Sequence, residues 1–281
     1  MRSIHDVSAP AKLNLFLHIN ARRDDGYHLL QSVFMLIDWC DTLHFDRRDD
    51  GAITREDLTA ALPEDDLVMR AARALQQASG TSAGAHIAID KQIPAQAGMG
   101  GGSSDAASTL LALNRLWNLN WPLAQLLPLG LRLGADVPFF LGGHNAWVEG
   151  IGEKITPITL PLRRFVVLKP SAGVETAQIF RHPDLRRDSE TATMPVFAVD
   201  PYGFGRNDLQ PVAQALCPEI TEALTWLGSF GLSPRMTGSG SAVFAHLPDG
   251  ALIDSAPHGW QMRICSNMAV HPQAGWAASE S

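Results

Sequence analysis

The first third of the chain alternates apolar and polar residues, as strands with one buried face do. From residue 11 to residue 19 the odd positions are apolar, and the even positions include Lys12, Asn14 and His18. A strand over 11–19 is therefore predicted. Similar patterns predict further strands over residues 31–39, 42–45 and 85–90, with a turn at 24–26.

Helical spacing of apolar residues appears in the middle of the chain. It predicts helices over residues 64–79, 104–117 and 123–133. In the second half the pattern predicts a strand at 165–169, a helix at 219–230 and a strand at 242–247. Residues after 270 are small, polar or interrupted by proline, so we expect them to be frayed.

Two prolines divide the predicted elements into two groups. Pro157 and Pro161 frame a short apolar segment, and a new strand begins shortly afterwards. We therefore expect an N-terminal domain over residues 1–160 and a C-terminal domain over residues 161–281.

The composition predicts a soluble globular protein. With 281 residues, of which 46% are hydrophobic, the chain can bury a full core. The formal net charge is −7 and the paired arginines are scattered among acidic residues, which argues against a nucleic-acid surface.

The three cysteines lack C-x-x-C spacing, so we expect buried thiols rather than a disulfide framework or a zinc site. No apolar run approaches the roughly 18 residues that span a bilayer, and we expect a cytoplasmic location.

A glycine-rich loop between a predicted strand and a predicted helix is the strongest chemical signal. Glycines at 98, 100, 101 and 102 let backbone N–H groups approach an anion, and the helix N-terminus expected at residues 103–105 favours phosphate. Glycine clusters more often form flexible turns, but the order of strand, loop and helix favours a phosphate site. No Gly-Lys-Ser/Thr follows, which excludes a Walker-type P-loop. Ser103 stands where a dinucleotide-binding G-x-G-x-x-G motif needs its third glycine.

Three further segments carry polar residues at strand or turn positions. Lys12 and Asn14 lie on the first predicted strand, and residues 236–241 form a glycine turn. Asp136 lies among apolar residues in the segment 134–140, where Pro138 predicts extended geometry. Together with the glycine loop and Asp25-Gly26-Tyr27-His28, these segments resemble the GHMP kinase superfamily in order and approximate spacing over nearly the whole chain.

The resemblance implies a two-lobe α+β fold with the active site in the cleft between the lobes, and ATP with Mg²⁺ as cofactors. It implies that Asp136 orients or deprotonates the attacking hydroxyl and that Lys12 supports it. On residue type alone, Asp136 would only cap a turn and Lys12 would only be a solvated lysine. The resemblance further implies a phosphate loop made of Pro94, Ala95, Gln96, Ala97, Gly98, Met99, Gly100, Gly101, Gly102, Ser103 and Ser104. Lys91 and Asp105 are secondary candidates for phosphate contact.

The Gly-Tyr-His element implies a cytidine diphosphate derivative as substrate. Tyr27 would stack on the pyrimidine and His28 would bond its edge, with Phe180 as a second stacking ring or simply a core residue. The remaining substrate contacts implied are Asn14, Thr237, Gly238 and Ser239. The implied reaction is phosphorylation of the 2-hydroxyl of 4-diphosphocytidyl-2-C-methyl-D-erythritol in the non-mevalonate isoprenoid pathway.

Two alternatives stay open from the sequence. One is a GHMP kinase that acts on homoserine, mevalonate or a sugar, and the other is a non-catalytic nucleotide-binding protein on the same fold. The pairing of Lys12 with Asp136 argues against the second, because a pure binding protein needs no base. We expect a monomer or weak homodimer that binds neither nucleic acid nor membrane.

Overall fold

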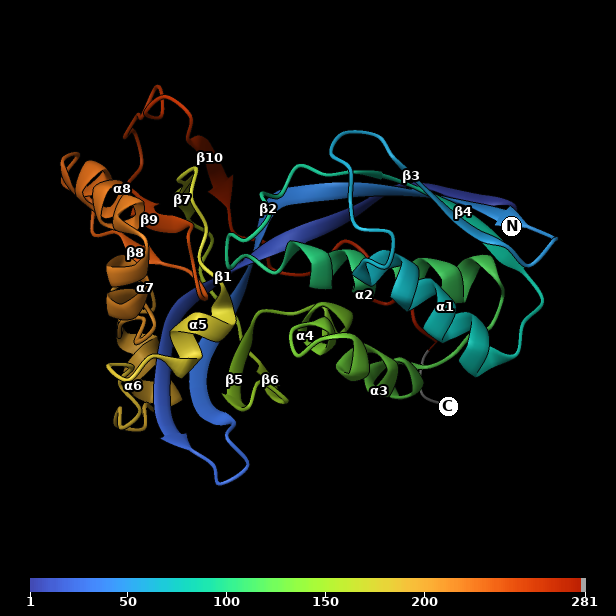
Figure 1. The fold of residues 1–281 in the computed structure, drawn as a ribbon, viewed down its shortest axis with the longest axis horizontal. Coiled ribbons are helices and arrows are strands. Elements are labelled where there is room, and N and C mark those ends of the chain that lie inside the picture. Colours follow the sequence, from blue (N-terminus) through green and yellow to red (C-terminus); the bar gives the residue numbers. More distant parts are fainter. Residues whose placement is uncertain (279–281) are drawn as a thin grey trace.

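The computed structural model describes residues 1–278 and contains two β-sheets (Figure 1). The first is six-stranded, with the order β3-β4-β2-β5-β6 and with β1 paired to β2. The second is four-stranded, with the order β10-β7-β9-β8. The strands of the first sheet are β1 (Ser3–Arg22), β2 (His28–Arg48), β3 (Ile53–Asp57), β4 (Gly84–Asp90), β5 (Ala146–Gly150) and β6 (Lys154–Pro157). Those of the second are β7 (Arg164–Lys169), β8 (Arg235–Met236), β9 (Val243–Leu247) and β10 (Gln261–Ser266).

Helices cover one face of each sheet (Figure 1). On the first sheet these are α1 (Leu67–Ser79), α2 (Gly101–Leu116), α3 (Leu123–Leu133) and α4 (Val137–Gly142). The second half of the chain contains α5 (Thr176–Arg181), α6 (Met194–Val199), α7 (Gln210–Leu216) and α8 (Pro218–Gly228), of which α7 and α8 pack on the second sheet. None of the helices between residues 1 and 278 has the length and apolarity to cross a membrane.

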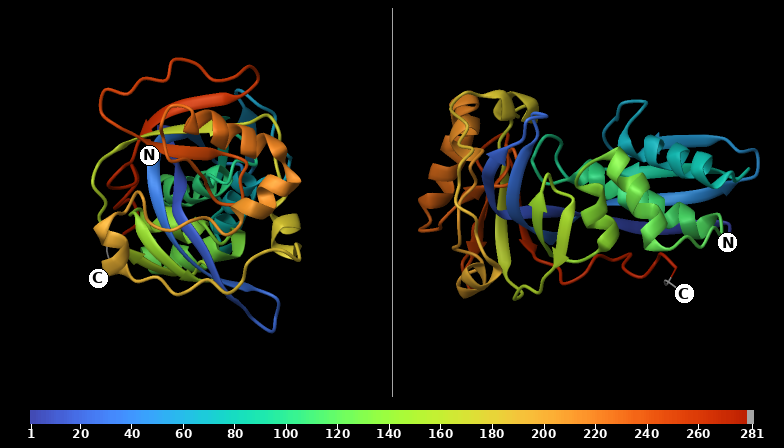
Figure 2. Two further views of the ribbon diagram at one scale, coloured as in Figure 1. Left: turned by 90° about the vertical axis from the view of Figure 1, so that its left-hand side faces the viewer. Right: turned by 90° about the horizontal axis from the view of Figure 1, so that it is seen from below.

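The long antiparallel pair β1–β2 joins the two halves of the molecule (Figure 2). One part of the pair packs on α1–α4, while Leu13 and Met35 share a core with Phe165 and Phe244 of the second sheet. The predicted strands 31–39 and 42–45 are one strand, because the irregularities between β1 and β2 are register shifts that bend the pair without breaking it. The pair therefore carries residues of β1 into the space between the sheets.

The last described residues return to the first sheet instead of fraying. Gln273 is buried; its Nε2 donates to the Ser8 carbonyl and its Oε1 accepts from Ser108 Oγ, both at 3.0 Å. His271 is buried as well. The prediction of frayed residues after 270 was wrong as far as residue 278, because buried polar side chains hold this segment together with Trp276 and Ala277, which pack against the core; residues 279–281 lie outside the described part.

Two further predictions concern the burial of the cysteines and the division into domains. Cys217 and Cys265 are buried as predicted, but Cys40 is only half-buried. The domain division at residue 160 stays a prediction. It lies between β6 and β7, which belong to different sheets.

Candidate active site

The glycine loop leads directly into α2, which begins at Gly101. Gly100 is the N-cap residue and has the left-handed conformation, with φ of 71°. The helix therefore starts two residues before residues 103–105, where its N-terminus was predicted. A Cβ on Gly100 would lie 3.1 Å from the Phe140 ring and 3.3 Å from Lys12 Cγ. The glycine therefore lets the start of α2, with its unpaired N–H groups, lie directly beside the Lys12 side chain.

The loop is held between the two halves of the molecule at Gly98. Its φ is 71°, and a Cβ here would lie 2.3 Å from the Thr237 carbonyl oxygen. Backbone hydrogen bonds from Ser241 to Gln96 and from Ala242 to Ala97, at 3.1 and 3.3 Å, join the same two segments. Only glycine permits this approach of backbone to backbone.

A cavity of about 990 Å³ opens in front of the loop. Of the predicted site residues, it is lined by Lys12, Asn14, Pro94 to Ser103, Asp136, Phe180, Gly238 and Ser239. Ser104 and Thr237 lie buried behind this surface. Three apolar residues that the sequence analysis did not single out, Leu62, Leu67 and Ile93, also line this cavity. Ile93 and Leu67 lie beside Gly101 and Gly102 at the start of α2.

Lys12 and Asp136 meet in this cavity, with 3.7 Å between Nζ and Oδ2. Burial lowers the pKa of Lys12, and the Asp136 carboxylate partly offsets this effect. The prediction of extended geometry around Asp136 was wrong. Its backbone is helical, with φ of −85° and ψ of −13°, and α4 begins at the next residue with Pro138 in its first turn. Proline is well tolerated there, because the first turn leaves its N–H groups unpaired in any case.

Asn14 connects Lys12 to the second half of the molecule. Lys12 Nζ donates to Asn14 Oδ1, and Asn14 Nδ2 donates to Ser32 Oγ at 2.9 Å. The Asn14 backbone N–H donates to Thr237 Oγ1 at 2.9 Å. Thr237 therefore positions the strand that carries Lys12 and Asn14 and does not itself line the cavity.

A second cavity, of about 530 Å³, adjoins the first. Both cavities share Leu30, Ile151, Ala177 and Phe180 in their walls. Tyr27 and His28 line only the second cavity, where the rings of His28 and Phe180 lie 5.1 Å apart between centroids. Tyr27 is 60% exposed. Tyr27, His28 and Phe180 therefore all line the second cavity, which adjoins the cavity in front of the glycine loop.

Comparisons with known proteins agree with this geometry. Residues 66–144 match the GHMP kinases N terminal domain, and residues 202–261 match the GHMP kinases C terminal domain. The 4-diphosphocytidyl-2-C-methyl-D-erythritol kinase of Albidiferax ferrireducens is 67% identical over 280 residues, which cover 100% of this chain and 98% of the relative. That of Delftia acidovorans is 64% identical over 286 residues and 100% of both chains. The chain belongs to the 4-diphosphocytidyl-2-C-methyl-D-erythritol kinase family.

Solved structures extend the comparison. A crystal structure of a 4-(cytidine 5'-diphospho)-2C-methyl-D-erythritol kinase superposes with a TM-score of 0.76 at 32% identity, covering 92% of this chain and 98% of that one. A homoserine kinase from Cytophaga hutchinsonii has a TM-score of 0.66 at 15% identity, covering 96% of each chain, and shares the fold. These comparisons confirm the predicted α+β fold, the predicted superfamily and the predicted kinase function. The use of ATP follows from membership of the family.

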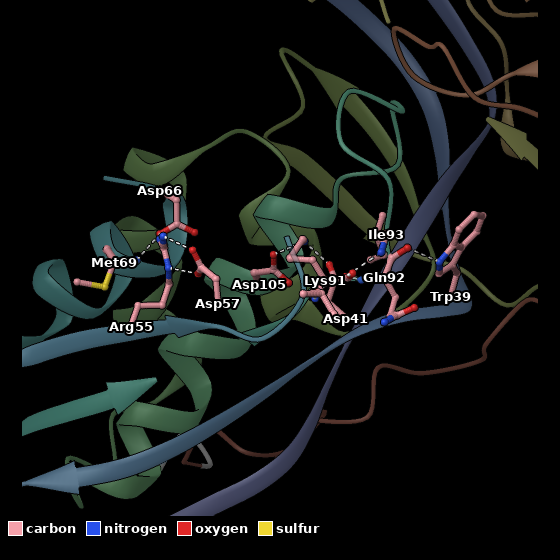
Figure 3. Close-up of polar contacts among 11 residues, drawn as sticks. Trp39, Asp41, Arg55, Asp57, Asp66, Met69, Lys91, Gln92, Ile93 and Asp105 are labelled. Atoms are coloured by element: carbon pink, nitrogen blue, oxygen red, sulfur yellow. Dashed lines mark hydrogen bonds and ion pairs between the residues drawn. The ribbon is translucent and has the colours of Figure 1, made fainter. Parts of the chain in front are cut away.

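Lys91 and Asp105, the secondary candidates for phosphate contact, both line the first cavity, and Lys91 lies between two carboxylates (Figure 3). Its Nζ donates to Asp41 Oδ2 and, at 2.6 Å, to Asp105 Oδ2. Asp41 Oδ1 also accepts the N–H groups of Gln92 and Ile93 at 2.6 and 2.7 Å. In this kinase the cluster fixes the chain where it enters the glycine loop.

The charges of this cluster depend on one another. Burial raises the pKa of Asp105 well above its usual range; the Lys91 ammonium opposes the rise and Asp41 adds to it. Burial also disfavours the Lys91 ammonium, but the two carboxylates outweigh this and raise its pKa. Sequence reasoning missed Asp41, which lies between the predicted strands 31–39 and 42–45, where its neighbours Cys40 and Thr42 give no signal of this role.

Proposed function

We propose that this chain transfers the γ-phosphoryl group of ATP to the 2-hydroxyl of 4-diphosphocytidyl-2-C-methyl-D-erythritol. The observation that carries the proposal is the Lys12–Asp136 pair, 3.7 Å apart, in a cavity bounded by the glycine loop and continuous with an aromatic cavity. The close full-length relatives carry the name of this activity. The same cavity would hold both substrates in contact with the pair.

The glycine loop would bind the phosphates of ATP. The N–H groups at the start of α2 have no partners within the helix, and the helix dipole adds partial positive charge there. The apolar wall formed by Leu62, Leu67 and Ile93 would suit the adenine ring.

Magnesium fits this loop as an ion held mainly by phosphate oxygens. No group of three potential metal-ligating His, Cys, Asp or Glu residues was found within residues 1–278. Ser103 lines the cavity, so its hydroxyl would supply an oxygen, which Mg²⁺ accepts, while Ser104 Oγ lies buried behind it without a hydrogen-bond partner. When bound, the ion would neutralise phosphate charge.

Asp136 would take the proton of the 2-hydroxyl or orient it toward the γ-phosphoryl group. Its carboxylate is partly exposed, with 31% of the side chain accessible, so it can face a bound substrate. Lys12 Nζ lies 3.7 Å from that carboxylate and would stabilise the negative charge on the transferring phosphoryl group. Asn14 would keep Lys12 in this position through its Oδ1 contact.

The cytosine ring would occupy the second cavity between Tyr27 and Phe180, with His28 at its edge. Gly238 and Ser239 would close the first cavity over the rest of the substrate. The domain division, a monomeric or weakly dimeric state and a cytoplasmic location remain part of the same proposal.

The test is ADP release from Mg-ATP with the purified chain and three acceptors offered separately. We expect turnover with 4-diphosphocytidyl-2-C-methyl-D-erythritol and none with homoserine or mevalonate. Turnover with either of the latter would refute the cytidine pocket while retaining the kinase. Binding of ATP without turnover on any acceptor would favour the non-catalytic alternative.

A further inference from the structure

Arg187 contacts His28 from the chain segment that follows α5. Its Nε donates to His28 Nε2 at 3.1 Å. The other guanidinium nitrogens donate to backbone carbonyls, including those of Leu185 and His182, each at 2.9 Å, and Phe180 at 3.2 Å. A guanidinium group only donates, so these contacts fix its orientation toward His28.

The contact determines which nitrogen of His28 carries the proton. Because Nε2 accepts from Arg187, the neutral imidazole must carry its hydrogen on Nδ1. Burial lowers the pKa of His28, and Arg187 and Arg22 lower it further, which favours the neutral ring. Arg181 of α5 adds another cation to the wall of the same cavity, and none of the described residues in that wall is acidic. The neutral ring of His28, which lines this cavity, thus has a single N–H donor, at Nδ1.

We propose that Arg187 is a positioning residue that holds His28 in the Nδ1–H form and thereby makes the cavity select cytosine over uracil. The inference rests on the proposed cytidine site. The two bases differ at N3, which accepts a hydrogen bond in cytosine and donates one in uracil. An Nδ1–H donor therefore pairs with N3 of cytosine and opposes N3–H of uracil, leaving both donors unsatisfied.

The tautomer can be measured on the unmodified protein by ¹⁵N NMR of the imidazole rings, with His28 assigned by comparison with His28→Gln. We expect the Nδ1 resonance of His28 in the protonated range and the Nε2 resonance in the unprotonated range at pH 8. Protonation on Nε2, or an even mixture of tautomers, would overturn the proposal. This measurement does not require any Arg187 variant to fold.

Kinetics with the cytidine substrate and its uridine analogue test the consequence. In Arg187→Met neutral His28 can exchange tautomers, so we expect the ratio of kcat/KM values, cytidine over uridine, to fall about tenfold at pH 8. Loss of Arg187 also raises the His28 pKa toward its ordinary value. At pH 5.5 the charged ring again carries Nδ1–H, and the ratio should partly recover. A variant that lowers both kcat/KM values equally, with no change in their ratio, would overturn the proposal.

Two controls separate this inference from the proposed function. Arg186 is an exposed neighbour that pairs with Asp188, so Arg186→Met removes the same charge without the His28 contact and should keep the ratio. His28→Ala should lose the preference for cytidine. If His28→Ala keeps the preference, the cytidine site itself is wrong. If it loses the preference and Arg187→Met keeps it, only the role of Arg187 is wrong.

Discussion

Gly98 should be the position in the phosphate loop that tolerates a side chain least. Its Cβ in Gly98→Ala would lie 2.3 Å from the Thr237 carbonyl oxygen and 2.9 Å from the Gly240 nitrogen, so one backbone segment must move. The left-handed φ costs about 1 kcal/mol. Loss of the two hydrogen bonds from Ser241 and Ala242 adds about 1 kcal/mol each. We expect Gly98→Ala to lower the free energy of unfolding by about 3 kcal/mol.

Gly80 provides the matched control. It has nearly the same φ, 66°, at the end of α1, but nothing lies within 4 Å of its Cβ position. Gly80→Ala should therefore lose only the conformational part, about 1 kcal/mol. Urea unfolding of both variants measures the difference, and the KM for ATP should rise in Gly98→Ala alone. Equal free energies of unfolding and an unchanged KM for ATP would refute the close approach of the two segments.

Three further predictions concern the second cavity, the C-terminal segment and the Asp41 cluster. Tyr27→Ala and Phe180→Ala should each raise the KM for the cytidine substrate about tenfold and leave the KM for ATP unchanged, in steady-state assays of both substrates; a rise in both would show general damage. Burial lowers the pKa of His271 to about 4, so the unfolded state binds the extra proton first and stability should fall as pH drops from 6.5 toward 4. Urea unfolding should show a loss of about 2 to 3 kcal/mol at pH 4.5, relative to pH 7.5, that is absent in His271→Gln; equal pH dependence in both proteins would contradict it. Asp41→Ala should cost about 3 kcal/mol in urea unfolding, because it leaves the N–H groups of Gln92 and Ile93 without their acceptor and leaves Lys91 with Asp105 alone, whereas Asp105→Asn should cost less than about 1 kcal/mol; the reverse order would refute the cluster's proposed role.

Local patterns predicted most of the first sheet and the helices on it. The alternation around Lys12 and Asn14 placed both residues on β1, and the strand before the glycine loop and the helix after it are β4 and α2. These features depend on residues close together in sequence, so periodicity reports them. The same reasoning fails at Asp136, because Pro138 predicts extended geometry there although proline also fits the first turn of α4.

Contacts between distant residues could not be predicted. The Asn14–Thr237 hydrogen bond joins residues 223 positions apart, and the Lys91–Asp41 pair joins residues 50 apart. Neither residue type nor spacing indicates such partners. Asn14 and Thr237 meet only when the two halves of the molecule pack together, and Lys91 and Asp41 meet only when β4 pairs with β2. Arg187 was missed for the same reason, since its contact with His28 spans 159 positions.

The central claim is that Asp136 acts on the hydroxyl of the bound substrate while the glycine loop and second cavity bind the two reactants. Steady-state kinetics of Asp136→Asn with Mg-ATP and 4-diphosphocytidyl-2-C-methyl-D-erythritol test it most directly, since asparagine keeps the size of the side chain and removes the base. The account predicts that kcat falls at least about 100-fold while both KM values change by less than about twofold. A kcat within about threefold of the wild-type value would contradict the assignment of Asp136.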